Sequence, residues 1–526
     1  MDRLFLIDDE TIDLDKVMDF IFSRKNFTSI QLGERSKQKV ENSFHHLINI
    51  LEKNIPVYGV TTGFGDSCNR VIPQEGREKL QENLISYLLC GTGDYLDYTV
   101  SKAILLLRII SLSKGNSGVS PSLLDHMIKF ANKGWYPLIP REGSLGASGD
   151  LVPLAYLGNI LRGQGKVLTK KGIVSSSELL NENNISPYRY GPKEGLAIVN
   201  GTSAMAALSI VNFNFAKKLI EMAHICTSWL CIVIKGRDEA FGDLVNKTAK
   251  FHKGQTKSAS IIKSLLEKEL HSPIPYEQIN IENELTQQMV QDPYSLRCSP
   301  QILGPIIETL DLIENWLENE INSVSDNPLI DDEGKLATGG NFYGGHLAHG
   351  MDYLKICLGN LADHLDRQLA LLINSKTNRG LPDNLVFTNG LNKEEKHLHH
   401  GLKGLHQCVS ALTSEIMALS IPNGIFSRSS ESHNQDKISL GMSSATQCSD
   451  LLEKVYSILS CHLICLAQAL DLREIKLKGN SSKKLYSLIR KYVPFITKDT
   501  QLDKEISNLK NSLKKQALKN NTDFNF

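Results

Sequence analysis

Residues 451–472, LLEKVYSILSCHLICLAQALDL, carry apolar side chains at every third or fourth position. This period places the apolar residues on one face of an α-helix. The apolar stripe consists of Leu452, Val455, Leu459, Leu463, Leu466 and Leu470. It covers roughly 20 residues, which corresponds to a helix about 30 Å long. The stretch therefore predicts a long helix with one buried face.

Two further stretches in the second half of the chain show the same period. Their stripes consist of Leu303, Ile306, Leu310, Ile313, Leu317 and Ile321, and of Leu354, Leu358, Leu361, Leu365, Leu369 and Leu372. Long helices of this kind bury their apolar faces by packing side by side. We therefore expect a mainly α fold built on a long-helix bundle.

The first 200 residues differ from the rest, because glycines interrupt shorter apolar segments. Within this part, Ala103–Leu112 predicts a buried helix that ends at Lys114-Gly115, since glycine commonly follows the last helical turn. We expect a smaller mixed N-terminal domain over residues 1–200. The central and C-terminal bundle would then occupy residues 201–526, with a polar tail at 500–526.

Composition excludes several classes of protein. The 526 residues include 58 Lys and Arg against 58 Asp and Glu, so the chain has no net charge that would attract nucleic acid or an anionic membrane. None of the ten cysteines forms a CxxC pair, which favours reduced thiols in a cytoplasmic protein. We see no signal peptide and no run of ~18 apolar residues, so no transmembrane helix is expected.

The most unusual segment is residues 143–154, GSLGASGDLVPL, in which three glycines allow tight folding of the backbone. It contains the tripeptide Ala147-Ser148-Gly149. The Gly149 amide nitrogen can attack the Ala147 carbonyl carbon and close a five-membered ring. Loss of water, including the Ser148 hydroxyl, then leaves an electrophilic methylidene group. Alone, the tripeptide occurs by chance in roughly one chain in five of this length, and a flexible turn is the simpler interpretation.

Its context changes that interpretation. In chain order, the sequence contains YGVTTGFG (58–65), GSLGASGDLVPLAYL (143–157), NGTSA (200–204), QDPYSLRC (291–298), SDNPLI (325–330) and HNQD (433–436). This series resembles the aromatic amino acid ammonia-lyases that carry a methylidene-imidazolone (MIO) group, which include histidine, phenylalanine and tyrosine lyases and related aminomutases. The resemblance spans about residues 40–480. It implies a bundle of the fumarase/aspartase-like lyase type, with the MIO loop in the N-terminal part.

The resemblance implies catalytic roles for Tyr58, Ala147, Ser148, Gly149, Asn200, Gln291, Tyr294 and Arg297. Ala147, Ser148 and Gly149 would form the MIO group autocatalytically, and this electrophile would capture the substrate amine. Tyr58 would be the base that removes the β-proton, and Arg297 would hold the substrate carboxylate through its bidentate guanidinium. The other three residues would orient the ring oxygen and the amine. No metal or nucleotide cofactor is implied.

The resemblance also implies a set of substrate-binding residues: Gly65, Tyr87, Leu88, Asn327, Phe342, Glu431 and Gln435. Histidine lyases carry His at the position of Leu88 and Glu at the position of Gln435. An apolar Leu88 against an imidazole would leave polar nitrogens unpaired, at a cost of about 1–3 kcal/mol each. We therefore expect elimination of ammonia from phenylalanine or tyrosine, which gives cinnamate or p-coumarate.

Several alternatives stay open at this point. One is a histidine ammonia-lyase that makes urocanate, and another is an MIO-dependent phenylalanine or tyrosine 2,3-aminomutase. A metal hydrolase is disfavoured, because His346 and His349 have no obvious third ligand. A scaffold with a decayed site is disfavoured because every chemically required residue is present. The resemblance also implies a homotetramer whose active sites combine residues from three chains.

Overall fold

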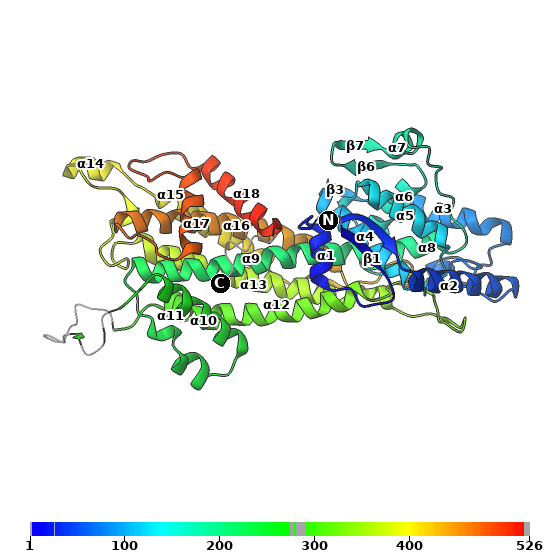
Figure 1. The fold of residues 1–526 in the computed structure, drawn as a ribbon, viewed down its shortest axis with the longest axis horizontal. Helices are drawn as coiled ribbons and strands as arrows, with labels where there is room; N and C mark the ends of the chain where they lie inside the picture. The colour runs from blue at the N-terminus through cyan, green and yellow to red at the C-terminus, as the bar shows by residue number, and fades with distance from the viewer. Residues whose placement is uncertain (1–2, 26, 274, 276–277, 280–289, 520–526) are drawn as a thin grey trace. The chain divides into compact units, whose positions relative to one another are not determined.

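The computed structural model describes residues 3–25, 27–273, 275, 278–279 and 290–519 (Figure 1). Helices dominate the described chain, and strands occur only in sheets of two or three members. The expectation of a mainly α fold is confirmed. Four helices exceed 20 residues and appear as the long ribbons of Figure 1: α9 (Ser203–Val233), α12 (Ser299–Ile321), α13 (Gly345–Ile373) and α16 (Gly441–Leu472).

The three apolar stripes predicted from the sequence lie in α12, α13 and α16, and every residue of the three stripes is buried. Helix α16 is long and apolar enough to cross a membrane by length and composition. However, 83% of the most apolar 18-residue stretch of this helix is buried inside the structure, as expected for the core helix of a bundle.

The chain forms two compact units, and each combines several segments. The first unit comprises Met1–Asn212, Ile313–Asp352 and Pro422–Cys448, and the second comprises Phe213–Leu312, Tyr353–Ile421 and Ser449–Phe526. All four long helices contribute residues to both units. The single boundary near residue 200 stays a prediction, because these units are defined by contacts rather than by one position along the chain.

The first unit contains all the described strands. β1 (Arg3–Ile7) pairs in parallel with β2 (Phe27–Leu32). The other pairs are antiparallel: β3 (Thr92–Tyr95) with β5 (Pro140–Glu142), and β8 (Leu329–Ile330) with β9 (Leu336–Ala337). The three-stranded antiparallel sheet has β6 (Lys166–Thr169) between β4 (Tyr136–Pro137) and β7 (Gly172–Ser175). Its remaining helices are α1 (Leu14–Ile21), α2 (Glu34–Glu52), α3 (Arg77–Tyr87), α4 (Tyr98–Ser113), α5 (Pro121–Lys133), α6 (Leu151–Leu161), α7 (Ser176–Glu182) and α8 (Glu194–Val199).

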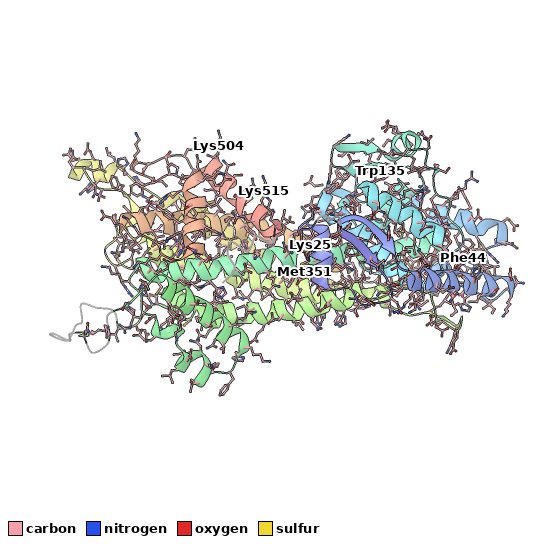
Figure 2. All side chains as sticks on the ribbon, viewed as in Figure 1. Lys25, Phe44, Trp135, Met351, Lys504 and Lys515 are labelled. Carbon is pink, nitrogen blue, oxygen red and sulfur yellow. The ribbon has the colours of Figure 1, made fainter. Side chains whose placement is uncertain are left out.

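Helix α4 is the buried centre of the first unit. It begins where the Asp97 carboxylate accepts a hydrogen bond of 2.9 Å from the Val100 amide, and it ends before Gly115, which has a φ of +79°. The predicted helix end at Lys114-Gly115 is therefore confirmed. The helix is buried on all sides from Ala103 to Ser113, and Arg108 is its one fully buried charge. Trp135, labelled in Figure 2, packs edge-on against Phe130 of α5 at 5.3 Å.

Among its described residues, the second unit contains helices and loops but no strand. Its own helices are α10 (Lys253–Lys268), α11 (Tyr294–Arg297), α14 (Lys393–Leu398), α15 (Lys403–Leu419), α17 (Asn480–Tyr492) and α18 (Asp503–Lys519). Helix α18 lies in the segment expected to be a polar tail. It buries Leu509, Leu513 and Ala517 at a spacing of four residues, a stripe that the surrounding Lys and Asn residues obscured.

Candidate active site

A cavity of about 710 Å³ opens in the first unit, and most of the residues predicted to act in the site line it. Those residues are Tyr58, Gly65, Tyr87, Leu88, Ala147, Ser148, Asn200, Asn327, Phe342, Glu431 and Gln435. They come from five of the six motif segments, or lie near them in the chain. The fold thus gathers segments separated by up to several hundred residues around one hollow.

The segment that carries Ala147-Ser148-Gly149 folds tightly at its glycines. Gly146 and Gly149 have φ values of +66° and +71°, in the left-handed region that favours glycine. A Cβ on Gly149 would lie 2.3 Å from the carbonyl oxygen of Gly201. The backbone amide of Asp150 donates a 2.7 Å hydrogen bond to the same oxygen. Only glycine fits position 149, because the backbone of the NGTSA segment lies directly against it.

Asp150 anchors this segment to helix α9. Its carboxylate is completely buried and accepts hydrogen bonds from the Ser144 hydroxyl at 3.0 Å and from the Met205 amide at 2.7 Å. Burial raises the pKa of Asp150 to about 7, against the lowering effect of these donors. The carboxyl therefore ties the loop to the first turn of α9.

Ser148 is held from two sides of the cavity. The Asn200 side-chain amide donates to the Ser148 carbonyl oxygen at 2.9 Å, and the Gln435 amide donates to the Ser148 hydroxyl at 3.2 Å. The other end of the Asn200 amide, Oδ1, is buried and has no hydrogen-bond partner among the described residues. A buried polar atom without a partner is costly, which indicates that Asn200 has a further ligand when the site is in use.

Tyr58 faces the cavity from the glycine-rich YGVTTGFG loop. Its hydroxyl oxygen accepts a hydrogen bond of 2.9 Å from the Gly65 amide, and its ring lies edge-on to Phe64 at 6.5 Å. Burial raises the pKa of Tyr58, the Gly65 donor opposes this shift, and the nearby Glu431 carboxylate adds to it. An additional positive charge or donor would be needed to stabilise the phenolate.

The loop that contains HNQD reaches both the Tyr58 loop and Ser148. Glu431 accepts a hydrogen bond of 3.0 Å from the Asp66 amide, and Gln435 makes the contact with Ser148 described above. Glu431, Ser432 and His433 all have φ values between +50° and +65°, a conformation that non-glycine residues rarely adopt. This left-handed turn brings one acidic and one amide side chain to opposite parts of the cavity.

The remaining wall is apolar and aromatic. Leu84 and Leu88 of the α3 segment expose only 2% and 8% of their surface, and Phe342 of the GGNFYGG segment lines the same cavity. Tyr87 is 60% exposed at the cavity edge. This wall suits a planar apolar group better than a charged one.

The site fits the MIO group that the resemblance implies. Gly149 lies in a cradle that a Cβ would fill, and Ser148 faces the cavity with its hydroxyl and carbonyl oxygen both held. Asn200 offers an unpartnered amide oxygen beside it. The donors are neutral amides, which can hold a neutral ring and its carbonyl oxygen without adding charge.

Three predicted residues belong to the second unit and do not line this cavity: Gln291, Tyr294 and Arg297. Gln291 is exposed, and the Arg297 guanidinium lies 4.5 Å from the centre of the Tyr294 ring. The segment is anchored by Asp292, whose buried carboxylate accepts from the Arg237 amide at 2.7 Å and pairs with Arg379. Gly149 is not among the lining residues either, and the backbone of Gly201 lies directly against it.

Sequence reasoning missed several residues of the site. Cys68, Thr338, Tyr343, Asn434 and Lys437 line the cavity and were not selected. Asn434 and Tyr343 lie inside quoted motifs, so their position was a usable signal. Arg108 was also missed, although it is the one charged residue in the apolar run AILLLRIISL of residues 103–112. That interruption of an apolar helix was the available clue.

Comparison with known proteins defines the class of protein as a carbon–nitrogen lyase. The chain belongs to the aromatic amino acid lyase family, whose model matches residues 12–491. It is 34% identical to the histidine ammonia-lyase of Natranaerobius thermophilus over 91% of both chains. It is also 34% identical to a hal-like protein of Dictyostelium discoideum, over 98% of this chain and 97% of that one.

Among solved structures, the phenylalanine aminomutase of Pantoea agglomerans superposes with a TM-score of 0.91 at 30% sequence identity. The match covers 98% of this chain and all of that one. Relatives by sequence and by structure thus include both an ammonia-lyase and an aminomutase.

Proposed function

We propose that the protein eliminates ammonia from an L-arylalanine, phenylalanine or tyrosine, to give cinnamate or p-coumarate. The observation that carries this proposal is the apolar wall formed by Leu84, Leu88 and Phe342 in the cavity that also contains Ser148. An aryl ring finds apolar contact there, whereas an imidazole finds no polar partner at Leu88.

Tyr58 is the proposed base for the β-proton of the substrate. It lines the same cavity as Ser148, and its hydroxyl oxygen already accepts a hydrogen bond from Gly65, which favours the phenolate. Asn200 and Gln435 hold Ser148 on either side. When formed from Ala147, Ser148 and Gly149, the MIO group would supply an electrophile for the substrate amine.

We propose that other copies of the chain complete the site. Arg297, the expected clamp for the substrate carboxylate, does not line the cavity of the first unit. The family resemblance implies a homotetramer with shared active sites. Light scattering after size exclusion should give a mass about four times the 58.5 kDa of the chain, and a monomer would contradict this part of the proposal.

Two alternatives have specific support. The sequence relatives reported above include a histidine ammonia-lyase, which favours histidine as the substrate. The structural relative is a phenylalanine aminomutase, which favours a β-amino acid as the product. Gln435 and Leu88 argue against histidine, and no cavity residue separates lyase from mutase.

The deciding experiment offers the purified protein phenylalanine, tyrosine and histidine separately. Products are followed by absorbance and by chiral chromatography, so that cinnamate, p-coumarate, urocanate and β-amino acids are all detected. We expect the largest kcat/KM for an arylalanine, with an acrylate product. Faster release of urocanate from histidine, or a dominant β-amino acid, would overturn the proposal in favour of the corresponding alternative.

We also propose a cytoplasmic location. All ten cysteines are free in the structure, which is compatible with a reducing compartment. Fractionation of cells that express the full chain tests this, and recovery in a secreted or organelle fraction would contradict it.

A further inference from the structure

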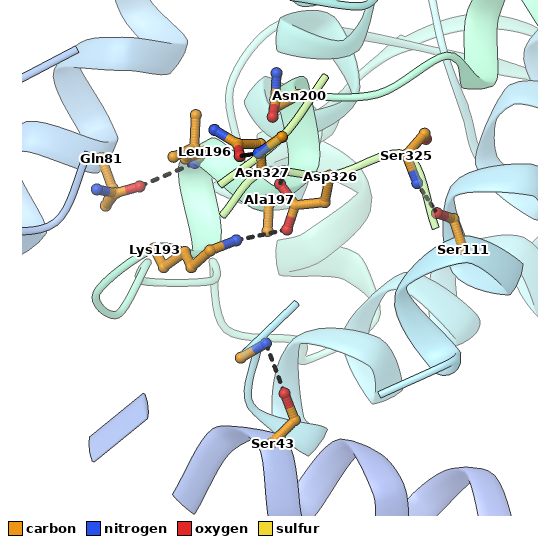
Figure 3. A network of polar contacts seen from close by, with 12 residues as sticks. Ser43, Gln81, Ser111, Lys193, Leu196, Ala197, Asn200, Ser325, Asp326 and Asn327 are labelled. Carbon is orange, nitrogen blue, oxygen red and sulfur yellow. Dashed lines mark hydrogen bonds and ion pairs between the residues drawn. The ribbon is translucent and has the colours of Figure 1, made fainter. Parts of the chain in front are cut away.

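Three fully buried charged side chains lie behind the cavity: Arg108 of α4, Lys193 before α8, and Asp326 of the SDNPLI segment. Lys193 and Asp326 form an ion pair with 2.5 Å between Nζ and Oδ2, and both side chains are completely inaccessible (Figure 3). Buried ion pairs often add little net stability, because both charges lose their hydration. Their presence beside a catalytic cavity therefore calls for a role other than stability.

Arg108 donates hydrogen bonds to the end of α8 that leads into Asn200, and its Nη1 also donates to the Ser325 hydroxyl at 3.4 Å. Its Nε contacts the Ala197 carbonyl oxygen at 2.9 Å, and its Nη2 contacts the Asn200 carbonyl oxygen at 3.2 Å. Burial lowers the pKa of Arg108 to about 10, so the guanidinium is positively charged at neutral pH. A fixed positive charge thus holds the backbone of the residue whose side chain binds Ser148.

Arg108, Gly201 and Gly149 also lie one behind the other in close contact. A Cβ on Gly201 would lie 1.9 Å from Nη1 of Arg108, and a Cβ on Gly149 would lie 2.3 Å from the Gly201 oxygen. The guanidinium therefore lies directly against Gly201, and Gly201 lies directly against Gly149. Displacement of Arg108 would transmit directly to the segment that carries Ser148.

The Lys193–Asp326 pair fixes the other ends of the same elements. Lys193 stands at the start of α8, which ends at Asn200, and it has a left-handed φ of +73°. Asp326 accepts a hydrogen bond of 2.7 Å from the amide of Asn327, which lines the cavity (Figure 3). The pair joins the helix that presents Asn200 to the loop that presents Asn327.

We propose that Arg108 is a positioning residue for the electrophile, with the Lys193–Asp326 pair as its support. Arg108 holds Asn200 and Gly201 against Ser148 and Gly149 in the arrangement that ring closure requires. In that closure the Gly149 nitrogen bonds to the Ala147 carbonyl carbon. Two water molecules leave: one takes the Ala147 oxygen and the amide hydrogens of Gly149 and Ser148, and the other takes the Ser148 hydroxyl and its Cα hydrogen. The inference rests on the proposed function, because it concerns the same electrophile.

The test compares Arg108→Met and Arg108→Lys with the wild type and with Arg162→Met as a matched control. Arg162 is a half-buried arginine of the same unit that bonds Asn159, Ser86 and the Glu82 carbonyl, and it does not line the cavity. Intact-protein mass reports ring formation as the loss of two waters, independently of activity. Melting temperature and separate kcat and KM values complete the comparison.

We expect Arg108→Met protein to retain most of its Ala-Ser-Gly in the uncyclised form. Arg108→Lys keeps the charge but not the forked geometry, so it should cyclise in part, with kcat about 100-fold lower and KM within about threefold. Arg162→Met should be fully cyclised even if its melting temperature falls as far as that of Arg108→Met.

Complete cyclisation and wild-type kcat in Arg108→Lys, together with complete cyclisation in any folded Arg108→Met, would overturn the inference. If Arg108→Met does not fold, Arg108→Lys alone decides. A wild-type protein without the mass loss would instead overturn the proposed function, so the two failures are distinguishable.

Discussion

Tyr58 and Tyr87 are neighbouring tyrosines of one cavity to which we assign different roles. Tyr58→Phe removes the proposed base but keeps the ring, so we expect kcat to fall by about 10²- to 10⁴-fold with phenylalanine as substrate. Intact mass should still show a cyclised protein, because the hydrogen bonds that hold Ser148 come from Asn200 and Gln435. Steady-state kinetics and mass spectrometry measure both effects.

Tyr87→Phe is the matched control, since it removes a hydroxyl at the cavity edge. It should change kcat for phenylalanine by less than about threefold. If the two variants lose activity equally, Tyr58 is not the base.

The pKa of Tyr58 is raised by burial, so the rate that depends on its deprotonated form should increase as pH rises from neutral toward alkaline values.

Leu88 tests the apolar wall. Leu88→His places polar nitrogens at a position that is 8% exposed, where an aryl substrate offers these nitrogens no hydrogen-bond partner. We expect kcat/KM for phenylalanine to fall by roughly 5- to 150-fold, corresponding to about 1–3 kcal/mol. Leu88→Met keeps volume and polarity and should stay within about threefold. Equal kcat/KM for Leu88→His and wild type would show that the substrate ring lies elsewhere.

At this scale the sequence predicted the cavity well where a motif carried the chemistry. Tyr58, Ser148, Asn200 and Gln435 were predicted because the motifs that contain them resemble those of a known family, and these residues line one cavity. Arg108 was missed because a lone arginine inside an apolar helix predicts burial but not its partner. Its partners are two carbonyl oxygens roughly 90 residues away and the more distant Ser325 hydroxyl, which no local pattern encodes.

At the scale of elements, the contact between α10 and α12 depends on two glycines. A Cβ on Gly304 would lie 2.5 Å from the Gln255 amide nitrogen, and one on Gly254 would lie 2.2 Å from the Gly304 oxygen. Gly304→Ala should therefore force the helices apart and lower the free energy of unfolding by about 1–3 kcal/mol. Denaturant titration of the second unit's helical signal measures this.

Gly404 provides the control, because it lies at the start of α15, where an added Cβ would have no neighbouring atom within 4 Å. Gly404→Ala should be neutral or stabilising by up to about 1 kcal/mol, since alanine favours helix. Equal destabilisation by both substitutions would mean that close helix packing is not the reason for Gly304.

Elements were predictable where one period persisted along the chain. The stripes of α12, α13 and α16 run for many residues, so their helices were evident. Helix α18 was not, because few apolar residues interrupt a highly charged segment, among them the buried Leu509, Leu513 and Ala517. The left-handed turn at residues 431–433 could not be predicted either, because its conformation is imposed by tertiary contacts such as that of Glu431 with Asp66.

At the scale of the molecule, buried histidines should make stability depend on pH. Burial lowers the pKa of His224 and His364 to about 4, and that of His462 to about 3. In the unfolded chain each titrates near 6.5. Below that value the unfolded state takes up protons that the folded state refuses. The stabilisation is therefore complete above about pH 6.5 and declines as pH falls toward 4.

His462→Leu should reduce this pH dependence. Neither ring nitrogen of His462 has a hydrogen-bond partner among the described residues, so its replacement by an apolar side chain costs little. We expect the fall in melting temperature between about pH 7.5 and about pH 5 to be smaller than in wild type. His397→Leu, at an exposed position, should keep the wild-type fall. An unchanged difference in His462→Leu would contradict the assignment.

The division of the long helices between the two units has a consequence for synthesis of the chain. The first unit lacks its last segment, Pro422–Cys448, until roughly 240 residues after Asn212 have been translated. At about 5–20 residues per second, this is a wait on the order of 10–50 s. During that time Gly146 lacks its hydrogen-bond partner Ser439, and Ser148 lacks Gln435. The nascent chain on the ribosome therefore cannot assemble this cavity before residues 422–448 have been translated.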